Sequence, residues 1–371
     1  MSATPCSIAI ILGTRPEAIK LAPVIQVFRQ DPAFQTWVVT TGQHREMVDQ
    51  VMGWFDLAVD HDLSIMQAGQ TLGDITCRTL QGLDPWLQAH RPQVVLVQGD
   101  TTTAFAAALA AFYQQIPIGH VEAGLRTDNL FSPYPEEANR RLISQLAQFH
   151  FAPTSLAVEN LRASDVTGAI HLTGNTVIDA LLQVAQAPVP CPVPGLDWQQ
   201  HRVLLATVHR RENWGQPLGQ IAAAFLQVLD RFPDTALVLP LHRNPTVRQV
   251  FQEKLAGHSR VYLTEPLDYP DLVAVLRQCT LVLSDSGGIQ EEAPSLGKPV
   301  LVLRDTTERP EAIQAGTARL VGTDTATIVQ AATELLSNSE AYQHMAQAAN
   351  PFGDGQAAQR IHQIVRTALE V

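Results

Sequence analysis

The sequence predicts an α/β fold made of two doubly wound, Rossmann-like domains, and three observations lead to this prediction. The chain has 371 residues, which favours two domains of about 150–200 residues because single hydrophobic cores rarely grow larger. Short, continuous Val/Ile/Leu runs recur along the chain, as is typical of parallel strands buried on both faces. Longer segments with helical periodicity separate these runs, so helices are expected on both faces of each sheet.

The predicted strands share a β-branched or leucine-rich core and end at glycine or polar residues. In the first half they cover residues 7–12, 37–41, 93–98, 116–121 and 149–153. The later ones cover residues 170–173, 202–208, 235–241, 260–264, 279–284, 298–303 and 318–322. Helical patterns of apolar residues are clearest at 101–115 and 217–232.

A Pro-rich segment at residues 187–198 interrupts the pattern near the middle of the chain. It can continue neither a helix nor a central strand, so we interpret it as a linker. We place the domain exchange between residues 172 and 200, which gives an N-terminal domain of 1–172 and a C-terminal domain of 173–371. Residues 355–369 predict an amphipathic last helix that packs on either domain, including back on the N-terminal one.

Composition excludes several classes of protein. Hydrophobic residues make up 46% of the chain, and no apolar run approaches the ~20 residues of a membrane-spanning helix. The first residues lack the basic region of a signal peptide. The net charge of −11 leaves no global positive field for nucleic acid or anionic lipid. We therefore expect a cytoplasmic protein that binds neither nucleic acid nor membranes.

The cysteines and histidines do not predict a metal site. Four cysteines are present, and no pair has metal-ligand or redox-motif spacing. They are Cys6, Cys77, Cys191 and Cys279. The histidines lack the spacing of a zinc-binding helix. Free thiols suit a reducing compartment, and no metal is expected.

Ligands of doubly wound sheets bind in loops beyond the carboxyl ends of the strands, so the loops after the predicted strands are the candidate sites. The first is GTRPEAIK, residues 13–20, where Gly13 permits a tight turn and Arg15 and Lys20 accompany the start of a helix. These features favour an anion site, although a capped helix with solvated charges explains them too. The loop is not GxGxxG, so no nicotinamide cofactor is expected.

Acidic residues follow three further segments of the first half. Asp100 and Glu122 come directly after strands, and Glu136 and Glu137 open a helix after two prolines. Each has a structural alternative, as a helix cap or as a charge favoured by the helix dipole. Three acidic groups at one edge nevertheless favour general acid–base chemistry.

The second half places basic and glycine-rich loops at the same kind of position. His209 and Arg210 follow one strand, and His242 and Arg243 follow the next; both pairs favour phosphate binding over structural histidines. The segment SDSGGIQEE then predicts a phosphate-binding turn, with Glu292 one helical turn further on, placed for ribose hydroxyls. Its glycines and serine are Ser286, Gly287 and Gly288. An ordinary Gly-rich turn is the alternative.

Together these motifs resemble the non-hydrolysing UDP-N-acetylglucosamine 2-epimerase family. In order they are GTRPEAIK, TGQHREM, GDTTT, HVEAGLR, PEEANR, LTGNT, HRREN, SDSGGIQEEAPSLGKPVL and RDTTERPEA, spread over residues 8 to 360. The resemblance implies a glycosyltransferase-B-type fold with a central cleft between the domains, and a homodimer. It also implies interconversion of UDP-N-acetylglucosamine (UDP-GlcNAc) and UDP-N-acetylmannosamine (UDP-ManNAc), for cell-surface polysaccharide precursors.

The resemblance also implies roles for individual residues. The substrate-binding set comprises Arg15, Lys20, Ser286, Gly287, Gly288, Glu292 and Arg309. The catalytic set comprises Asp100, Glu122, Glu136 and His209. A second UDP-GlcNAc, acting as an activator, would use Gln43, His44, Arg210 and His242.

Three positions depart from the family pattern. Leu272 stands where many members have an aromatic residue that packs on uracil. At the activator site, Glu46 replaces a glutamine and Gly69 an arginine. These two changes predict weaker activator binding.

The C2 proton of the sugar is not acidic, so the expected mechanism cleaves the C1–O bond and removes this proton to give a 2-acetamidoglucal. Return of UDP to C1 and a proton to the other face of C2 completes the inversion. Sequence does not distinguish which carboxylate takes which step. Three competing functions are a hydrolysing epimerase that releases UDP and N-acetylmannosamine, a glycosyltransferase, and a sugar-nucleotide sensor on the same fold.

Overall fold

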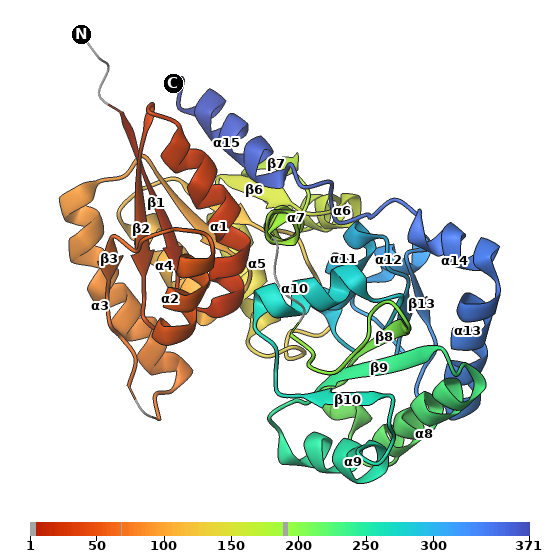
Figure 1. The fold of residues 1–371 in the computed structure, drawn as a ribbon. Helices are drawn as coiled ribbons and strands as arrows, with labels where there is room; N and C mark the ends of the chain where they lie inside the picture. The colour runs from red at the N-terminus through yellow and green to blue at the C-terminus, as the bar shows by residue number, and fades with distance from the viewer. Residues whose placement is uncertain (1–4, 68, 188–191) are drawn as a thin grey trace. The chain divides into compact units, whose positions relative to one another are not determined.

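The computed structural model describes residues 5–67, 69–187 and 192–371, which form two compact units (Figure 1). The first unit comprises Met1–Ala180 and Phe352–Val371, and the second comprises Leu181–Pro351. The chain thus leaves the first unit at residue 180, within the range 172–200 predicted for the domain exchange, and returns to it at Phe352. Residues 188–191 of the predicted linker lie outside the described residues.

The first unit is built on a seven-stranded sheet in the order β3-β2-β1-β4-β5-β6-β7. All neighbouring strands pair in parallel. The strands are β1 (Cys6–Leu12), β2 (Phe34–Thr40), β3 (His61–Asp62), β4 (Val94–Gln98), β5 (Ile118–Val121), β6 (Phe149–Ala152) and β7 (Ala169–Leu172). The chain direction across the sheet reverses between β1 and β4, which is the topological switch point where doubly wound sheets bind ligands.

Helices connect these strands and cover the sheet. They are α1 (Arg15–Gln30), α2 (Arg45–Trp54), α3 (Leu72–His90), α4 (Thr102–Tyr113), α5 (Glu136–Leu146), α6 (Ser155–Ala163) and α7 (Thr176–Gln186). Half of the residues of α4 are alanine, and the helix packs against α3 and α5. Small side chains allow this close approach, and helix propensity is highest for alanine.

The last helix, α15 (Ala357–Ala368), belongs to the first unit and packs along α1, as Figure 1 shows. Its buried face includes Ile361 and Val365. His362 Nε2 lies 2.9 Å from an oxygen of Asp31, which follows α1, and Arg366 pairs with the same carboxylate. Apolar burial and this ion pair together attach the end of the chain to its beginning.

The second unit repeats the architecture with six parallel strands in the order β10-β9-β8-β11-β12-β13. They are β8 (Arg202–Thr207), β9 (Thr235–Pro240), β10 (Val261–Thr264), β11 (Leu281–Ser284), β12 (Val300–Val302) and β13 (Ala318–Leu320). Its helices are α8 (Gln216–Arg231), α9 (Pro245–Leu255), α10 (Tyr269–Gln278), α11 (Gly287–Glu292), α12 (Pro310–Gln314), α13 (Thr325–Ser337) and α14 (Ser339–Ala346), with short 3₁₀ turns at Arg211–Asn213 and Ala293–Leu296. Here the switch point lies between β8 and β11.

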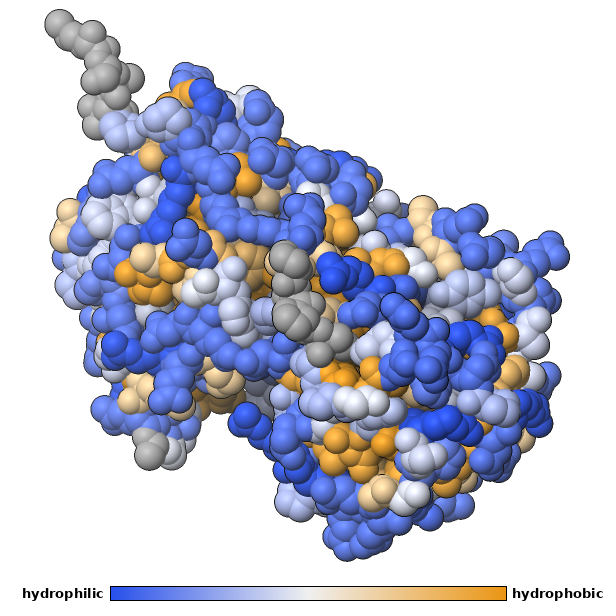
Figure 2. Space-filling view, viewed as in Figure 1, coloured by the Kyte–Doolittle hydropathy of each residue, from blue (hydrophilic) through white to orange (hydrophobic). Residues whose placement is uncertain are grey.

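The doubly wound α/β fold predicted from the sequence is confirmed, and all twelve predicted strands form. The prediction missed β3, which has only two residues, His61 and Asp62, and no apolar run. No helix in the described part of the chain is long and apolar enough to cross a membrane. On the face shown in Figure 2, hydrophilic side chains cover most of the surface and apolar ones gather only in small groups.

Candidate active site

The loop after β1 meets the loop after β4 at the switch point of the first sheet. Gly13 is required there by close approach and not by an unusual backbone angle, because a Cβ at this position would collide with Thr41 and lie 2.8 Å from Thr103 Oγ1. The carboxylate of Glu17, in the first turn of α1, accepts hydrogen bonds from the Gly13 and Thr14 amides at 3.0 and 2.7 Å. These contacts hold the loop tightly against the sheet.

The same glutamate reaches the neighbouring loop. Glu17 accepts a 2.6 Å hydrogen bond from the Thr101 hydroxyl, and Thr101 also caps α4 by accepting from the Ala104 amide. Glu17 is buried, and burial raises its pKa while the hydrogen bonds oppose that rise. One internal carboxylate therefore fixes the two loops of the first switch point to each other.

Glu122 lies just beyond β5 with a left-handed backbone, at φ 64°. Three donors surround its carboxylate: Lys20 Nζ at 2.5 Å, Asn175 Nδ2 at 3.1 Å and the amide of Gln98. The side chain is 5% exposed. Lys20, which the sequence placed in an anion site, is thus the ion-pair partner of a predicted catalytic glutamate.

Asp100 lies at the end of β4, beside this group. Arg140 Nη1, from α5, contacts its carboxylate at 2.7 Å. Burial raises the pKa of Asp100; the positive charge of Arg140 opposes this rise, and the negative charges of Glu122 and Glu136 add to it. The structure thus brings two predicted catalytic carboxylates, Glu122 and Glu136, within electrostatic range of the third, Asp100.

The structure distinguishes between the two glutamates that open α5. Glu137 is fully buried and receives hydrogen bonds from Arg140, Arg141 and the Thr127 amide, all at 2.7–3.1 Å. Its carboxylate therefore holds the helix and the preceding loop together. Glu136 is half-buried, and within the described residues its carboxylate forms no comparable set of hydrogen bonds.

In the second unit, a buried aspartate organises the switch-point loops. Asp285 follows β11, and its carboxylate accepts hydrogen bonds from the amides of His209 and Arg210, both at 2.9 Å, and from the side chain of Asn213 at 2.9 Å. His209 and Arg210 follow β8. The loops after β8 and β11 are therefore connected by one carboxylate.

The imidazole of His209 also contacts Asp285, with Nδ1 3.2 Å from Oδ1. Burial lowers the pKa of His209, the carboxylate of Asp285 opposes this, and the neighbouring Arg210 and His242 reinforce it. The rings of His209 and His242 stack with centroids 5.6 Å apart. His209 is therefore oriented through Nδ1, which leaves its Nε2 edge directed away from Asp285.

The glycine-rich turn that begins α11 lies beside two arginines. A Cβ at Gly287 would lie 3.7 Å from Arg210 Nη2 and 3.9 Å from the guanidinium of Arg309. The Ser284 hydroxyl accepts from the Ser286 amide at 3.0 Å, and the Ser286 side chain does not cap α11. Arg309 also pairs with Glu291. Arg210, which the sequence assigned to an activator site, lies at this predicted phosphate loop.

Glu292 ends α11 and is buried. The hydroxyl of Tyr269 donates to its Oε1 at 2.8 Å. Burial and the adjacent carboxylate together raise the pKa of Tyr269 well above its ordinary value. Tyr269 therefore stays a neutral donor that orients Glu292, the predicted ribose ligand.

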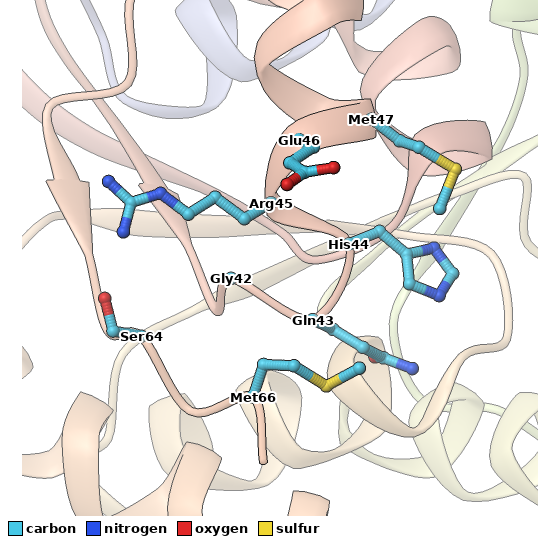
Figure 3. A pocket seen from close by; sticks show the side chains of 8 residues that line it. All are labelled: Gly42, Gln43, His44, Arg45, Glu46, Met47, Ser64 and Met66. Atoms are coloured by element: carbon cyan, nitrogen blue, oxygen red, sulfur yellow. The ribbon is translucent and has the colours of Figure 1, made fainter. Parts of the chain in front are cut away.

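Gln43 and His44, two further predicted activator residues, line a cavity of about 470 Å³ in the first unit. Figure 3 shows Arg45 directed away from Gln43 and His44. Glu46, Met47, Ser64 and Met66 complete much of the wall. Gln43 is fixed by the Thr103 hydroxyl at 2.9 Å, so the cavity adjoins the first switch point.

Two Rossmann-like units with this strand order, acidic loops in one and a phosphate-type turn in the other, define the glycosyltransferase-B-type class of sugar-nucleotide enzymes. A glycosyltransferase of kitacinnamycin shares the fold, with a TM-score of 0.69 at 13% identity over 98% of this chain and 99% of its own. A family model described as UDP-N-acetylglucosamine 2-epimerase matches residues 26–366. The chain belongs to the UDP-N-acetylglucosamine 2-epimerase family.

Individual relatives are similar over nearly their whole length. The UDP-N-acetylglucosamine 2-epimerase of Escherichia coli K12 is 50% identical over 361 residues, which cover 95% of this chain and 96% of that protein. A crystal structure of a putative enzyme of this name from Listeria monocytogenes has a TM-score of 0.94 at 48% identity, covering 99% and 97% of the two chains. The Neisseria meningitidis enzyme bound to UDP-GlcNAc has a TM-score of 0.85 at 47% identity, covering 97% and 100%.

Sequence reasoning missed several residues that build the site. Glu17, Arg140 and Asp285 were visible in the motifs, but no local signal marked them as the partners of other loops. Asn175 lies in the LTGNT motif and received no role. The burial of Glu17 and Asp285 beside glycine turns, which marks them as structural partners, is visible only in the structure.

Proposed function

We propose that the chain interconverts UDP-GlcNAc and UDP-ManNAc by eliminating UDP and adding it back to the resulting glucal, which gives the opposite epimer. The supporting observation is the group of carboxylates Asp100, Glu122 and Glu136 at the ends of β4 and β5 and the start of α5, in a member of this epimerase family. Inversion at C2 requires proton transfer on both faces of the sugar, and paired acidic groups suit this task.

In the first step the C1–O bond breaks and its electron pair leaves with UDP. The C2–H bond supplies the electrons of a new C1–C2 double bond, and its proton passes to a carboxylate. His209, Arg309 and the turn Ser286–Gly288 in the second unit stabilise the departing diphosphate, aided by Arg15. The product of this step is 2-acetamidoglucal with UDP still bound.

The second step reverses the first on the other face of the ring. A carboxylic acid protonates C2, and the UDP oxygen attacks C1. Asp100 is suited to carry a proton because burial raises its pKa. Glu122, surrounded by donors, is suited to accept one as a carboxylate. The two residues exchange roles when the reaction runs backward.

Proton NMR of UDP-GlcNAc incubated with the enzyme in heavy water tests this proposal. We expect UDP-ManNAc that carries deuterium at C2. Free N-acetylmannosamine as the main product would establish the hydrolysing alternative. Epimer without solvent deuterium would contradict proton exchange at C2.

We further propose that the cavity of Gln43 and His44 takes part in binding a second UDP-GlcNAc, but weakly. Glu46 contributes a carboxylate to the cavity wall, and a carboxylate repels a diphosphate. An arginine with its bidentate donors is missing at Gly69.

We also propose that the protein is a homodimer and that it is located in the cytoplasm. The family resemblance supports the dimer, and the free cysteines Cys6, Cys77 and Cys279 are consistent with a reducing compartment. Light scattering coupled to size-exclusion chromatography measures the mass in solution, and twice the 40.5 kDa of one chain is expected.

A further inference from the structure

Asn175 joins the LTGNT segment to the acidic group of the first unit. It lies between β7 and α7 and is 1% exposed. Its Nδ2 donates to Glu122 Oε1 at 3.1 Å, while its Oδ1 accepts from the Val177 amide at 3.1 Å. One side chain therefore begins a helix with its oxygen and contacts a proposed catalytic residue with its nitrogen.

The returning end of the chain holds the backbone of Asn175 in place. The Asn175 amide donates to the Phe352 carbonyl at 2.7 Å. Gly174 and Gly353 face each other so closely that a Cβ on Gly353 would lie 3.4 Å from the Asn175 nitrogen. Both glycines have positive φ, at 90° and 138°.

Two further contacts attach the returning segment to the same region. Asp179, in α7, accepts from the amides of Ala357 and Ala358 at 3.2 and 2.8 Å, and so caps the start of α15. Arg360 donates to the Thr173 carbonyl at 3.0 Å. The segment Phe352–Ala358, with Arg360 just after it, therefore holds the residues on both sides of Asn175 in place.

We propose that Asn175 is a positioning residue for Glu122 and that the segment Phe352–Ala358 positions Asn175. The amide donor stabilises the ionised form of the carboxylate and fixes its orientation. This inference rests on the proposed role of Glu122 in proton transfer. The segment Phe352–Ala358 supplies no proposed catalytic residue. The inference adds that this segment affects the reaction by positioning the side-chain amide of Asn175.

A purely structural role for Asn175 predicts something different. Capping α7 needs only an acceptor for the Val177 amide, and Asp or Ser supplies one. Positioning Glu122 needs the Nδ2 donor, which neither Asp nor Ser supplies. Asn175→Asp and Asn175→Ser therefore keep the cap and remove the contact with Glu122.

The test is the pH profile of kcat/KM for epimerisation, followed as deuterium incorporation at C2. Loss of a hydrogen bond to the ionised carboxylate of Glu122 raises its pKa. The acidic limb of the pH profile should therefore move to higher pH, by about one unit in Asn175→Ser. It should move further in Asn175→Asp, because the new carboxylate faces Glu122. We expect kcat to fall about 10-fold or more while KM changes little.

Asn160→Ser and Asn160→Asp are the matched controls. Asn160 Nδ2 donates to the Gly124 carbonyl at 2.9 Å, in the same unit and close to the same loop, but not to Glu122. These variants should leave the acidic limb where it is in the wild type. An unmoved limb in folded Asn175 variants, or an equal shift in the Asn160 variants, would overturn the inference. Failure of the wild type to incorporate deuterium would instead contradict the proposed function.

Gly353→Ala tests the second half of the proposal from outside the site. The new methyl group would be in van der Waals contact with the Asn175 nitrogen, and a φ of 138° strains any side chain at this position. The returning segment should therefore shift, and the limb should move in the same direction by a smaller amount. Gly195→Ala is its control, because Gly195 also has a positive φ, 79°, but a Cβ there meets no atom within 4 Å. A shift in both variants, or in neither, would contradict a specific contact through Gly353.

Discussion

In each unit one buried carboxylate connects the two loops at the switch point of the sheet. The carboxylate follows the first of the two strands in the first unit and the second of them in the second unit. In the first unit Glu17 belongs to the helix after β1 and reaches across to Thr101 after β4. In the second, Asp285 follows β11 and reaches back to His209 and Arg210 after β8. Either arrangement satisfies loop amides that would otherwise face outward without partners.

The loops that these carboxylates hold carry different chemistry. The loops of the first unit carry the carboxylates Asp100, Glu122 and Glu136. Those of the second carry His209, Arg210 and Arg309. A common topology fixes where functional groups stand, and the loop sequence alone decides their charge. This comparison predicts that substitutions in the first unit affect turnover and that those in the second affect nucleotide binding.

The largest effect is expected from the acidic residues of the first unit. Asp100→Asn, Glu122→Gln and Glu136→Gln should each lower kcat by about 100-fold or more, as for lost acid–base groups. The affinity for UDP, measured by calorimetry, should change far less. If all three variants kept wild-type turnover, these carboxylates would be structural and the division between the units would fail.

Substitutions at the phosphate turn should act on affinity. Arg309→Ala removes a charge beside Gly287, and Gly287→Ala places a methyl group where a phosphate would approach. A lost hydrogen bond to a charged group costs about 1.5–3 kcal/mol, or roughly 10- to 150-fold in the Kd for UDP.

Arg15→Ala shows whether the first unit shares this role. Arg15 lies over the Trp54 ring at 5.5 Å, so its guanidinium is held at the start of α1. A similar loss of UDP affinity is expected. Unchanged calorimetric binding in Arg15→Ala, Arg309→Ala and Gly287→Ala alike would contradict the assignment of the phosphate site.

Buried histidines should make the first unit the more acid-sensitive one. His120 and His150 are paired in register on the neighbouring strands β5 and β6, and both are fully buried. Burial lowers their pKa values to about 3 and about 4. Histidine in an unfolded chain titrates near 6.5, so below about pH 6.5 the unfolded state binds protons that the folded state does not. The unfolding free energy should therefore fall with decreasing pH, by up to about 1.4 kcal/mol per pH unit for each histidine, until the folded pKa is reached.

Hydrogen exchange at pH 7 and pH 5, corrected for intrinsic rates, separates the units. In the described part of the second unit no histidine is fully buried: His209 is half-buried, and the carboxylate of Asp285 opposes the lowering of its pKa. Strands β5 and β6 should lose protection before β8 and β11. Simultaneous loss in both sheets would show that the two histidines do not govern acid stability.

The smallest effect concerns the second UDP-GlcNAc. With Glu46 in the cavity and Gly69 in place of an arginine, we expect a Hill coefficient closer to one than to two. Pure UDP-ManNAc should turn over without added UDP-GlcNAc. A strict requirement for UDP-GlcNAc in this reverse reaction would show that other residues rebuild the activator site.

Sequence patterns predicted most of the fold, because buried parallel strands need continuous apolar runs and these are local. They also predicted Asp100, Glu122 and Gly287 as site residues, since functional groups follow strands in this topology. The partner of each group was not predictable. Lys20 pairs with Glu122, which is far away in sequence, and only the fold shows that Glu137 and not Glu136 is locked by arginines.

The return of the chain at Phe352 has a consequence for how the protein is made. The second unit is continuous in sequence, so all of it is synthesised before the last helix of the first unit. The first unit begins earliest and is completed last, when α15 reaches α1. Until then the apolar face of α1 that α15 covers stays open to solvent, and nascent chains that stop before Phe352 should be recognised as incomplete by factors that bind exposed apolar surface.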